Sequence, residues 1–330
     1  MSAFKDKVIL ITGGTGSFGK ACVKKLLEAH DPASIRIYSR DELKQWEMAR
    51  EFGNHPKLRF LIGDVRDAER LQRATEGVDY LIHAAALKHV PACEYNPVEA
   101  VRTNVDGAIN VINAALNNNV KKVIALSTDK AVNPVNIYGA TKLCSDRLFI
   151  QSNSYRGIHR GTRFSVVRYG NVMASRGSVI PLFRKQAESG VVTITDPHMT
   201  RFWITLPHAV DFVLSSFEMM QGGEMFVPKI PSMKISDLAK VIAPKAKQKV
   251  IGVRPGEKRH ESLITREEGQ LAREMKDRYV VLSSSVEWPY DKSEFNRMRK
   301  VKDGFEYNSY SNPVYLTQKE MLKMLDELGV

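Results

Sequence analysis

The sequence predicts an α/β protein in which a doubly wound parallel sheet is joined to a smaller α/β lobe at the C-terminus. Through the first half of the chain, short apolar and β-branched segments alternate with segments of helical spacing. A glycine-rich turn follows the first apolar segment, and the alternation becomes irregular after Asn171. We therefore expect two units, a main domain formed by residues 1–170 and 201–222 and a second lobe formed by residues 171–200 and 223–330.

The composition is that of an ordinary globular protein, with 43% hydrophobic and 26% charged residues in a chain of 330. No apolar run approaches the roughly 18 residues needed to cross a bilayer, so we expect no membrane association and a cytoplasmic location. Cys22, Cys93 and Cys144 are odd in number and far apart, which favours reduced thiols over disulfides. His83 and His89 have no carboxylate or cysteine at ligand spacing, so we expect no metal site.

The formal charge of +12 restricts the class of partner. Such a charge is compatible with nucleic acid, an anionic membrane surface or a phosphorylated small molecule. The basic residues are dispersed among acidic ones and no nucleic-acid motif is recognisable, so we expect no nucleic-acid partner. A ligand that carries a pyrophosphate accounts for the charge more simply.

The first predicted strand, Lys7–Ile11, leads through a turn with Gly-x-x-Gly-x-x-Gly spacing into a helix. Glycine is needed where such a turn is tight, where backbone approaches a phosphate and where the helix packs on the strand. The start of the helix supplies free N–H groups and the positive end of a dipole for a pyrophosphate. A plain structural turn is the alternative. The favoured interpretation is a Rossmann-like dinucleotide site with contacts from Gly13, Thr15, Gly16, Ser17, Phe18 and Gly19.

The second predicted strand, residues 35–38, is followed by the residues that select the cofactor. A dinucleotide without a 2′-phosphate usually meets a carboxylate here, whereas this chain has Ser39 and Arg40, with Lys44 shortly after. Because a guanidinium favours a phosphate, we predict NADP rather than NAD. Asp41 and Glu42 lie close by and keep NAD open as the alternative.

Two more strands and a helix complete the predicted cofactor site. The strand over residues 58–65 brings its end beside the adenine, and the strand over residues 78–86 ends in small residues that let the cofactor lie flat. A helix from Asn96 to Ala115 has one apolar face, which Asn104 interrupts. This side chain either bonds backbone near the nicotinamide or satisfies a buried turn. The expected contacts are Asp64, Val65, Ala84, Ala85, Ala86 and Asn104.

The central strand, Lys121–Leu126, ends before a cluster of reactive side chains. Thr128, Asp129 and Lys130 follow it, at the edge where open α/β sheets bring ligands. Tyr138 and Lys142 are four residues apart at the start of the next helix and therefore share one face. A phenol with a pKa of about 10 needs a nearby cation to act as a base near neutrality, and Lys142 is placed to supply one. A Tyr-x-x-x-Lys pair alone is more typical of an ordinary helix surface.

The rest of the chain is less regular. We expect a sixth strand over residues 164–169, a helix from 178, short strands over 191–195 and 199–204, and a helix over 206–219 that returns to the sheet. From Glu224 on, short strands and helices mix with several prolines, and the tail after about Ser284 is highly charged.

Taken together, the glycine turn, the acidic residue after the third strand, Thr128 ahead of Tyr-x-x-x-Lys and the C-terminal lobe resemble the extended short-chain dehydrogenase/reductases. The Thr-Asp-Lys run with Tyr138, and the stretches 40–44, 84–91 and 254–258, are similar to the small UDP-N-acetylglucosamine 4,6-dehydratases of pseudaminic acid synthesis, which invert C5. The resemblance implies an NADP-binding main domain, a nucleotide-sugar-binding lobe, UDP-N-acetylglucosamine as substrate and a homo-oligomer.

The resemblance also implies catalytic roles. Tyr138, beside Lys142 and NADP⁺, takes the 4-hydroxyl proton, and Thr128 bonds the same oxygen. Lys130 removes the C5 proton if its pKa is lowered, and Asp129 protonates the departing 6-hydroxyl if its pKa is raised. The implied substrate contacts are Lys88, Asn171, Ser178, Thr195, Met199, Arg201, Arg254 and Glu257.

Two other functions stay open at this point. A UDP-sugar 4-epimerase would use the same tyrosine and cofactor without elimination. A catalytically silent NADP-binding scaffold would keep the glycine turn but typically lose the Tyr/Lys pair, which this chain retains.

Overall fold

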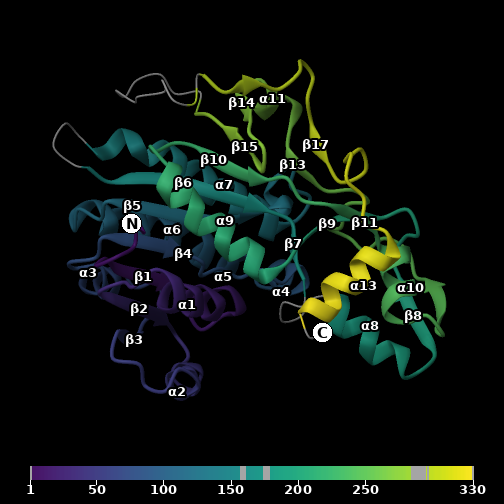
Figure 1. The fold of residues 1–330 in the computed structure, drawn as a ribbon, viewed down its shortest axis with the longest axis horizontal. Coiled ribbons are helices and arrows are strands. Elements are labelled where there is room, and N and C mark those ends of the chain that lie inside the picture. The colour runs from purple at the N-terminus through teal and green to yellow at the C-terminus, as the bar shows by residue number, and fades with distance from the viewer. Residues whose placement is uncertain (1, 157–160, 174–178, 284–294, 296, 329–330) are drawn as a thin grey trace.

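The central feature of the computed structural model is a ten-stranded sheet, shown in Figure 1. The structure describes residues 2–156, 161–173, 179–283, 295 and 297–328. Seven neighbouring strands are parallel, and their strand order reverses direction between β1 and β4. Ligands of open α/β sheets bind at the carboxyl ends of the strands beside such a switch point. In spatial order these strands are β3 (Leu58–Ile62), β2 (Ser34–Ser39), β1 (Val8–Thr12), β4 (Tyr80–His83), β5 (Lys122–Thr128), β6 (Arg163–Tyr169) and β10 (Met225–Pro228).

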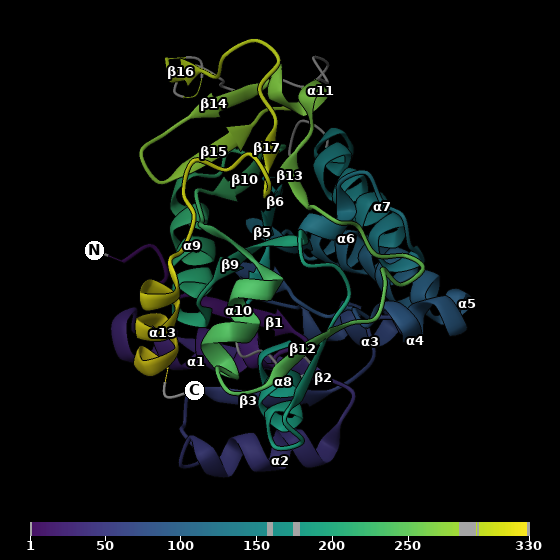
Figure 2. The ribbon, with the colours of Figure 1, turned by 90° about the vertical axis from the view of Figure 1, so that its right-hand side faces the viewer.

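Helices cover both faces of this sheet. Helices α1 and α9 pack together on one face, while α3, α6 and α7 form the layer on the other face (Figure 2). Helical apolar faces and the strands between them form one continuous core, as expected where both faces of a parallel sheet are buried. The helices of this domain are α1 (Ser17–Ala29), α2 (Glu42–Glu51), α3 (Ala68–Ala74), α4 (Val90–Tyr95), α5 (Pro97–Val101), α6 (Gly107–Asn117), α7 (Ile137–Gln151) and α9 (Leu206–Met219).

One predicted helix is divided. Between α5 and α6 the chain forms a π-helical turn, Arg102–Asp106, which contains the buried Asn104. Such turns occur frequently at functional sites because they redirect a side chain from the regular helix. Short 3₁₀ turns follow β5 at Asp129–Ala131 and α7 at Ser152–Arg156.

The boundary of the second lobe differs from the expected one. Residues from 223 on were assigned to that lobe, yet β10 lies beside β6, with Met225 opposite Val166 and Phe226 opposite Val167. The reason is that this apolar strand is buried on both sides and completes the core of the main sheet. Three antiparallel strands extend the sheet further: β15 (Arg278–Val281), β14 (Ala272–Glu274) and β16 (Arg299–Lys300).

The second lobe has its own small core around Trp203, Phe183 and Leu238. It lies beside the carboxyl edge of the main sheet, with α8, α10 and α13 grouped together in Figure 1. Its strands are β7 (Asn171–Val172), β8 (Val191–Ile194), β9 (Thr200–Ile204), β11 (Ser232–Lys234) and β12 (Lys247–Val250), and its helices are α8 (Val179–Ala187), α10 (Ile235–Ile242) and α13 (Gln318–Glu327). The remaining elements are β13 (Ser262–Ile264), α11 (Arg266–Gly269) and β17 (Tyr307–Asn308), and Leu263, Ile264 and Tyr307 belong to the core of the main domain.

Among the residues described, none of the helices combines the length and apolar character that a membrane span requires. The same residues hold no group of three or more His, Cys, Asp or Glu side chains that could bind a metal ion.

Candidate active site

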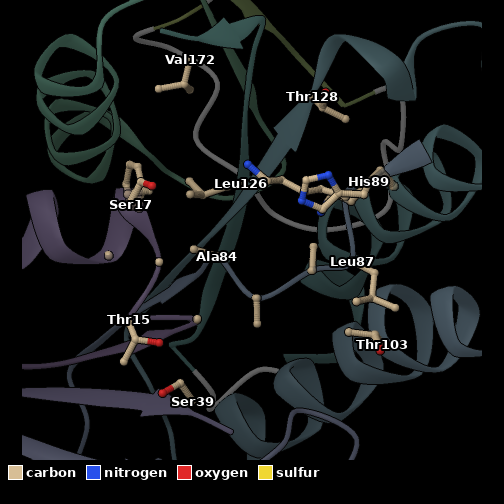
Figure 3. A pocket seen from close by; sticks show the side chains of 18 of the residues that line it. Thr15, Ser17, Ser39, Ala84, Leu87, His89, Thr103, Leu126, Thr128 and Val172 are labelled. Carbon is tan, nitrogen blue, oxygen red and sulfur yellow. The ribbon is translucent and has the colours of Figure 1, made fainter. Parts of the chain in front are cut away.

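A cavity of about 750 Å³ lies at the carboxyl edge of β1, β4 and β5. Figure 3 shows Thr15, Ser17 and Ser39 along one side of it and Thr128 and His89 along the other. Sixteen of the seventeen residues expected to contact the cofactor line this cavity. These sixteen are Gly13, Thr15, Gly16, Ser17, Phe18, Gly19, Ser39, Arg40, Lys44, Asp64, Val65, Ala84, Ala85, Ala86, Tyr138 and Lys142.

The glycine turn has the geometry that a dinucleotide requires. Gly13 has a φ of +67°, and a Cβ there would lie 2.9 Å from the Cα of Ala85. A Cβ on Gly19 would lie 2.2 Å from the carbonyl oxygen of Gly14, so the helix can pack on the turn only with glycine. Gly16 precedes α1 without a side-chain cap, and the first turn of this fully described helix holds no acidic residue. Its N–H groups are therefore available to an anionic diphosphate.

Acidic and basic groups alternate at the end of the cavity lined by Ser39 and Arg40, where the sequence predicts that the cofactor is selected. Arg40 Nη1 lies 3.6 Å from Asp64 Oδ2, which also accepts from Arg66 Nη2 at 2.7 Å. Burial would raise the pKa of Asp64, but the hydrogen bonds and charge of Arg66 hold it below its ordinary value. Asp41 caps α2 and pairs with Lys44. Both carboxylates at this end already have cationic partners.

Asn104 is the one expected cofactor residue that is absent from the described cavity lining. Its amide instead bonds both backbone groups of Leu87, with Leu87 N donating at 2.8 Å and Nδ2 donating to the Leu87 carbonyl at 2.9 Å. Nδ2 also donates to Thr141 Oγ1 at 3.0 Å. Asn104 therefore holds the backbone of the loop after β4, and Leu87 of that loop lines the cavity.

The four expected catalytic residues converge where β5 meets α7. Lys130 Nζ donates to Asp129 Oδ1 at 3.0 Å, and Thr128 Oγ1 donates to the same oxygen at 3.0 Å. Thr128, Lys130 and Tyr138 line the cavity, and Asp129 lies behind them with no exposed surface. Asp129 Oδ2 is buried and has no hydrogen-bond partner among the residues that the structure describes. An unpaired buried oxygen of this kind is suited to a ligand hydroxyl.

The electrostatics of the Asp129/Lys130 pair favour the charged form of each residue. Burial would raise the pKa of Asp129, but the charge and hydrogen bond of Lys130, with Arg201 and Lys258, lower it. Burial would lower the pKa of Lys130, but the carboxylates of Asp129 and Glu261 raise it. The free protein therefore does not meet the two conditions attached to the implied roles, a lowered lysine pKa and a raised aspartate pKa, because the lysine lies between two carboxylates. The pair is therefore an aspartate and an ammonium.

Tyr138 is a neutral phenol in this environment. Burial raises the pKa of Tyr138 to about 12, while the charge of Lys130 and a hydrogen bond with Thr128 act to lower it. Lys130, rather than Lys142, exerts the largest of the charge effects that favour the phenolate. Burial also lowers the pKa of Lys142, which Asp146 partly offsets. Lys142 thus lies in a buried network that continues through Asp146.

The predicted substrate residues fall into two groups. Lys88 and Asn171 line the cavity, and Asn171 Oδ1 accepts from Lys130 Nζ at 3.3 Å. Burial and the charge of Lys130 lower the pKa of Lys88. Ser178 lies outside the described residues.

The other predicted substrate residues are not part of the described lining of the cavity. Thr195 Oγ1 lies 3.3 Å from the sulfur of Met199, which is buried in the core of the second lobe. The Arg201 guanidinium donates to the backbone carbonyls of residues 200, 258 and 259. Arg254 Nη1 lies 3.9 Å from Glu257 Oε1. In this structure these residues shape the lobe around the site.

Two residues near the pair were not identified from the sequence. Glu261 is 2% exposed, and its Oε2 lies 2.6 Å from Lys258 Nζ. Lys258 also donates to the backbone carbonyl of Val132 at 2.8 Å. The sequence feature that could have pointed to both residues is the dense run of charges from 257 to 261, which overlaps the Arg-Pro-Gly-Glu-Lys stretch.

Comparison with known proteins assigns the chain to one family. The family model described as "Polysaccharide biosynthesis protein" matches residues 9–283. The chain is 54% identical to a UDP-N-acetylglucosamine 4,6-dehydratase (inverting) of Campylobacter jejuni, over 98% of each chain. It is 46% identical to a UDP-glucose 4-epimerase of Rickettsia conorii, over 98% of this chain and 97% of that protein.

Two solved structures have the same fold. The X-ray structure of Pen from Bacillus thuringiensis matches with a TM-score of 0.90 and 38% identity, over 99% of both chains. DesIV, a dTDP-glucose 4,6-dehydratase from Streptomyces venezuelae with NAD and TYD bound, matches with a TM-score of 0.68 and 22% identity, over 76% of this chain and 86% of that one. The latter match concerns the fold alone. The predicted doubly wound, Rossmann-like α/β fold is confirmed.

Proposed function

The chain belongs to the polysaccharide biosynthesis protein family and has the fold of the extended short-chain dehydrogenase/reductases, and we propose that it is a UDP-N-acetylglucosamine 4,6-dehydratase that inverts C5. The product would be UDP-2-acetamido-2,6-dideoxy-β-L-arabino-hex-4-ulose. The observation that carries the proposal is the Asp129/Lys130 pair, 3.0 Å apart, beside Tyr138 in a cavity built for a dinucleotide. Elimination of water needs an acid and a base in addition to the redox tyrosine, and this pair supplies both.

The glycine turn from Gly13 to Gly19, together with Ser39 and Ala85, would hold a dinucleotide whose nicotinamide would supply the hydride acceptor for C4 and the hydride donor for C6. The phenolate form of Tyr138 would accept the proton of the 4-hydroxyl, and Thr128 would hydrogen-bond the same oxygen. Lys130 would remove the C5 proton, which the new C4 ketone makes acidic. Asp129 would protonate the departing 6-hydroxyl, so that one water leaves. Delivery of a proton to the opposite face of C5 completes the inversion.

The charged state of the pair requires one step before this chemistry. Lys130 would pass a proton to Asp129 along the 3.0 Å hydrogen bond, which converts the ammonium and carboxylate into an amine and a carboxylic acid. These are the protonation states that removal of the C5 proton and departure of water require. Binding of the sugar favours the exchange because it excludes water from the cavity and so weakens the solvation of both charges.

We propose NADP as the cofactor. Support comes from Arg40 and Lys44, which line the adenosine end of the cavity, and from the occupied carboxylates of Asp41 and Asp64, which already bind Lys44 and Arg66. A free carboxylate would favour a ribose 2′-hydroxyl, whereas cations favour a 2′-phosphate.

A 4-epimerase is the second candidate, because the chain is 46% identical to a protein of that name. An epimerase needs no acid/base pair beyond the tyrosine, and the Asp129/Lys130 pair therefore favours the dehydratase. Mass spectrometry of the product from UDP-N-acetylglucosamine separates the two. A dehydratase product is lighter by one water, and a product of unchanged mass would instead support the epimerase.

The biological setting is part of the same proposal. The reaction would be the first step toward pseudaminic acid and the modification of flagellin or surface glycans. The homo-oligomeric state and the cytoplasmic location stay predictions from the sequence.

A further inference from the structure

Glu261 places one carboxylate between two lysines beside the proposed catalytic pair. Its Oε2 lies 2.6 Å from Lys258 Nζ, and its Oε1 lies 3.9 Å from Lys130 Nζ. The side chain is only 3% exposed, so these charges face one another with little water between them. Two hydrogen bonds hold the backbone of Glu261 in place. Its N–H donates to Ser309 Oγ at 2.9 Å, and Ser309 N donates to the Glu261 carbonyl at 2.7 Å.

Lys258 connects Glu261 to the turn that carries the catalytic pair. Its Nζ donates to the carbonyl of Val132 at 2.8 Å and approaches the carbonyl of Asp129 at 3.5 Å. The carboxylate of Glu261 therefore forms a 3.9 Å ion pair with the Lys130 amine and is linked through Lys258 to the turn that carries Lys130. Both contacts come from a segment more than a hundred residues away in the chain.

Several charged groups surround Lys130. Asp129 and Glu261 are the anions, Arg201 is a cation and Tyr138 is a neutral phenol. Lys88 is a further cation, on the loop after β4, and Lys258 reaches Lys130 only through Glu261. When Asp129 is a neutral acid, Glu261 is the carboxylate that still faces Lys130.

We propose that Glu261 is a positioning residue that holds the Lys130 amine at the reacting carbon and stabilises its ammonium form while Asp129 is protonated. The inference rests on the proposed function. After Lys130 takes the C5 proton, it is a cation beside a neutral Asp129 until that acid gives its proton to the leaving hydroxyl. Glu261 neutralises the cation during this interval, which makes Lys130 a stronger base for C5.

The test is the substitution Glu261→Gln, which removes the negative charge of the side chain and keeps its shape. Lys130 then loses one of its two anions, so its pKa falls and it becomes a weaker base. With lysine labelled with ¹³C at Cε, and the Lys130 signal assigned by Lys130→Arg, NMR should show the amine of the variant losing its proton at a lower pH than the wild-type amine. Exchange of the C5 proton with solvent should slow more than about tenfold, with KM within about twofold of wild type.

Asp196→Asn is the matched control, because Asp196 is a buried carboxylate that pairs at 2.8 Å with Arg259 of the same segment. This variant should leave both the Lys130 titration and C5 exchange within about twofold of wild type. If Glu261→Gln folds and leaves both quantities unchanged, the inference is wrong. If it does not fold, Glu261→Asp decides, because it retracts the charge by one methylene: several-fold slower exchange supports the role, and unchanged exchange overturns it.

The lysine titration needs no substrate, so it separates this inference from the proposed function. Wild-type protein that shows neither water loss nor C5 exchange would refute the dehydratase. The lysine signal would still report whether Glu261 controls the charge of Lys130.

Discussion

Lys130 and Asp129 are adjacent in the sequence and hold one another in their charged forms through a 3.0 Å hydrogen bond. The carboxylate is fully buried, whereas a quarter of the lysine side chain is exposed at the cavity. The pair can therefore keep its shared proton away from solvent and still present the amine to a ligand. In the proposed mechanism, this arrangement would separate the elimination of water from the proton transfer assigned to Tyr138.

Removing either member of the pair should stop water loss without preventing cofactor binding. Lys130→Ala and Asp129→Asn should each lower the rate of dehydration by about a hundredfold or more, because each removes a general acid or base. Product mass spectrometry measures the rate, and fluorescence titration with NADPH measures binding. Lys121→Ala, at an exposed lysine that pairs with Asp79, serves as the control and should retain activity. Near-normal turnover in both pair variants would refute the elimination roles.

Tyr138 should act one step earlier than the pair. Tyr138→Phe should abolish oxidation at C4, whereas Lys130→Ala should still oxidise the sugar and accumulate reduced cofactor, although more slowly, because the charge of Lys130 favours the Tyr138 phenolate. Because burial raises the pKa of Tyr138 to about 12, the phenolate fraction grows throughout the neutral range, so oxidation in a single turnover should accelerate with pH. Stopped-flow absorbance of the reduced nicotinamide follows this step. Oxidation that persists in Tyr138→Phe would assign the proton transfer to another group.

Arg40→Asp should move the cofactor preference from NADP toward NAD. A charge-assisted hydrogen bond to the 2′-phosphate is worth about 1.5–3 kcal/mol, which corresponds to roughly tenfold or more in affinity. Fluorescence titration measures the dissociation constants for NADPH and NADH. Their ratio is compared between the variant and wild type, so a general loss of binding affects both constants and cancels. An unchanged ratio would show that Arg40 does not meet the phosphate.

His83 should make folding sensitive to mild acid. It lies buried at the end of β4 with Nδ1 2.8 Å from Thr12 Oγ1, and burial, with a smaller effect of Lys142, lowers its pKa to about 3. The unfolded chain binds a proton below the ordinary pKa of 6.5 while the folded protein does not. The contribution of His83 to the free energy of unfolding is therefore fully present above pH 6.5. It falls by up to about 1.4 kcal/mol per pH unit as the pH drops toward 3.

Urea unfolding at a series of pH values measures this dependence. His83→Asn should flatten the slope below pH 6.5, whereas His208→Asn, at an exposed position on α9, should leave it as in wild type. Parallel curves for wild type and His83→Asn would show that His83 does not titrate in this way.

The parallel sheet and the cofactor cavity were predictable from the sequence because their residues are local in the chain. Each strand end brings its neighbours in sequence to the same edge, so Gly13, Ser39, Ala84 and Thr128 come together from periodicity alone. β10 was placed in the second lobe because an apolar strand after an irregular stretch carries no sign of the sheet it joins.

The environment of the catalytic pair was not predictable from local sequence. Glu261 lies 3.9 Å from Lys130, and the charges of Asp129 and Glu261 together reverse the lowering of the lysine pKa that burial alone would produce. Arg201 and Met199 were expected at the substrate, but the first bonds backbone carbonyls and the second packs in the lobe core. The type of a residue indicates which chemistry its side chain can perform. Contacts between segments far apart in the sequence decide where that side chain lies and which groups it contacts.

The most direct test of the central claim is incubation with UDP-N-acetylglucosamine in D₂O, followed by NMR of the product. The proposed reaction predicts a 4-keto-6-deoxy sugar that has lost one water, carries deuterium at C5 and has the L-arabino configuration. A C4 epimer with an intact 6-hydroxyl and no deuterium at C5 would contradict it.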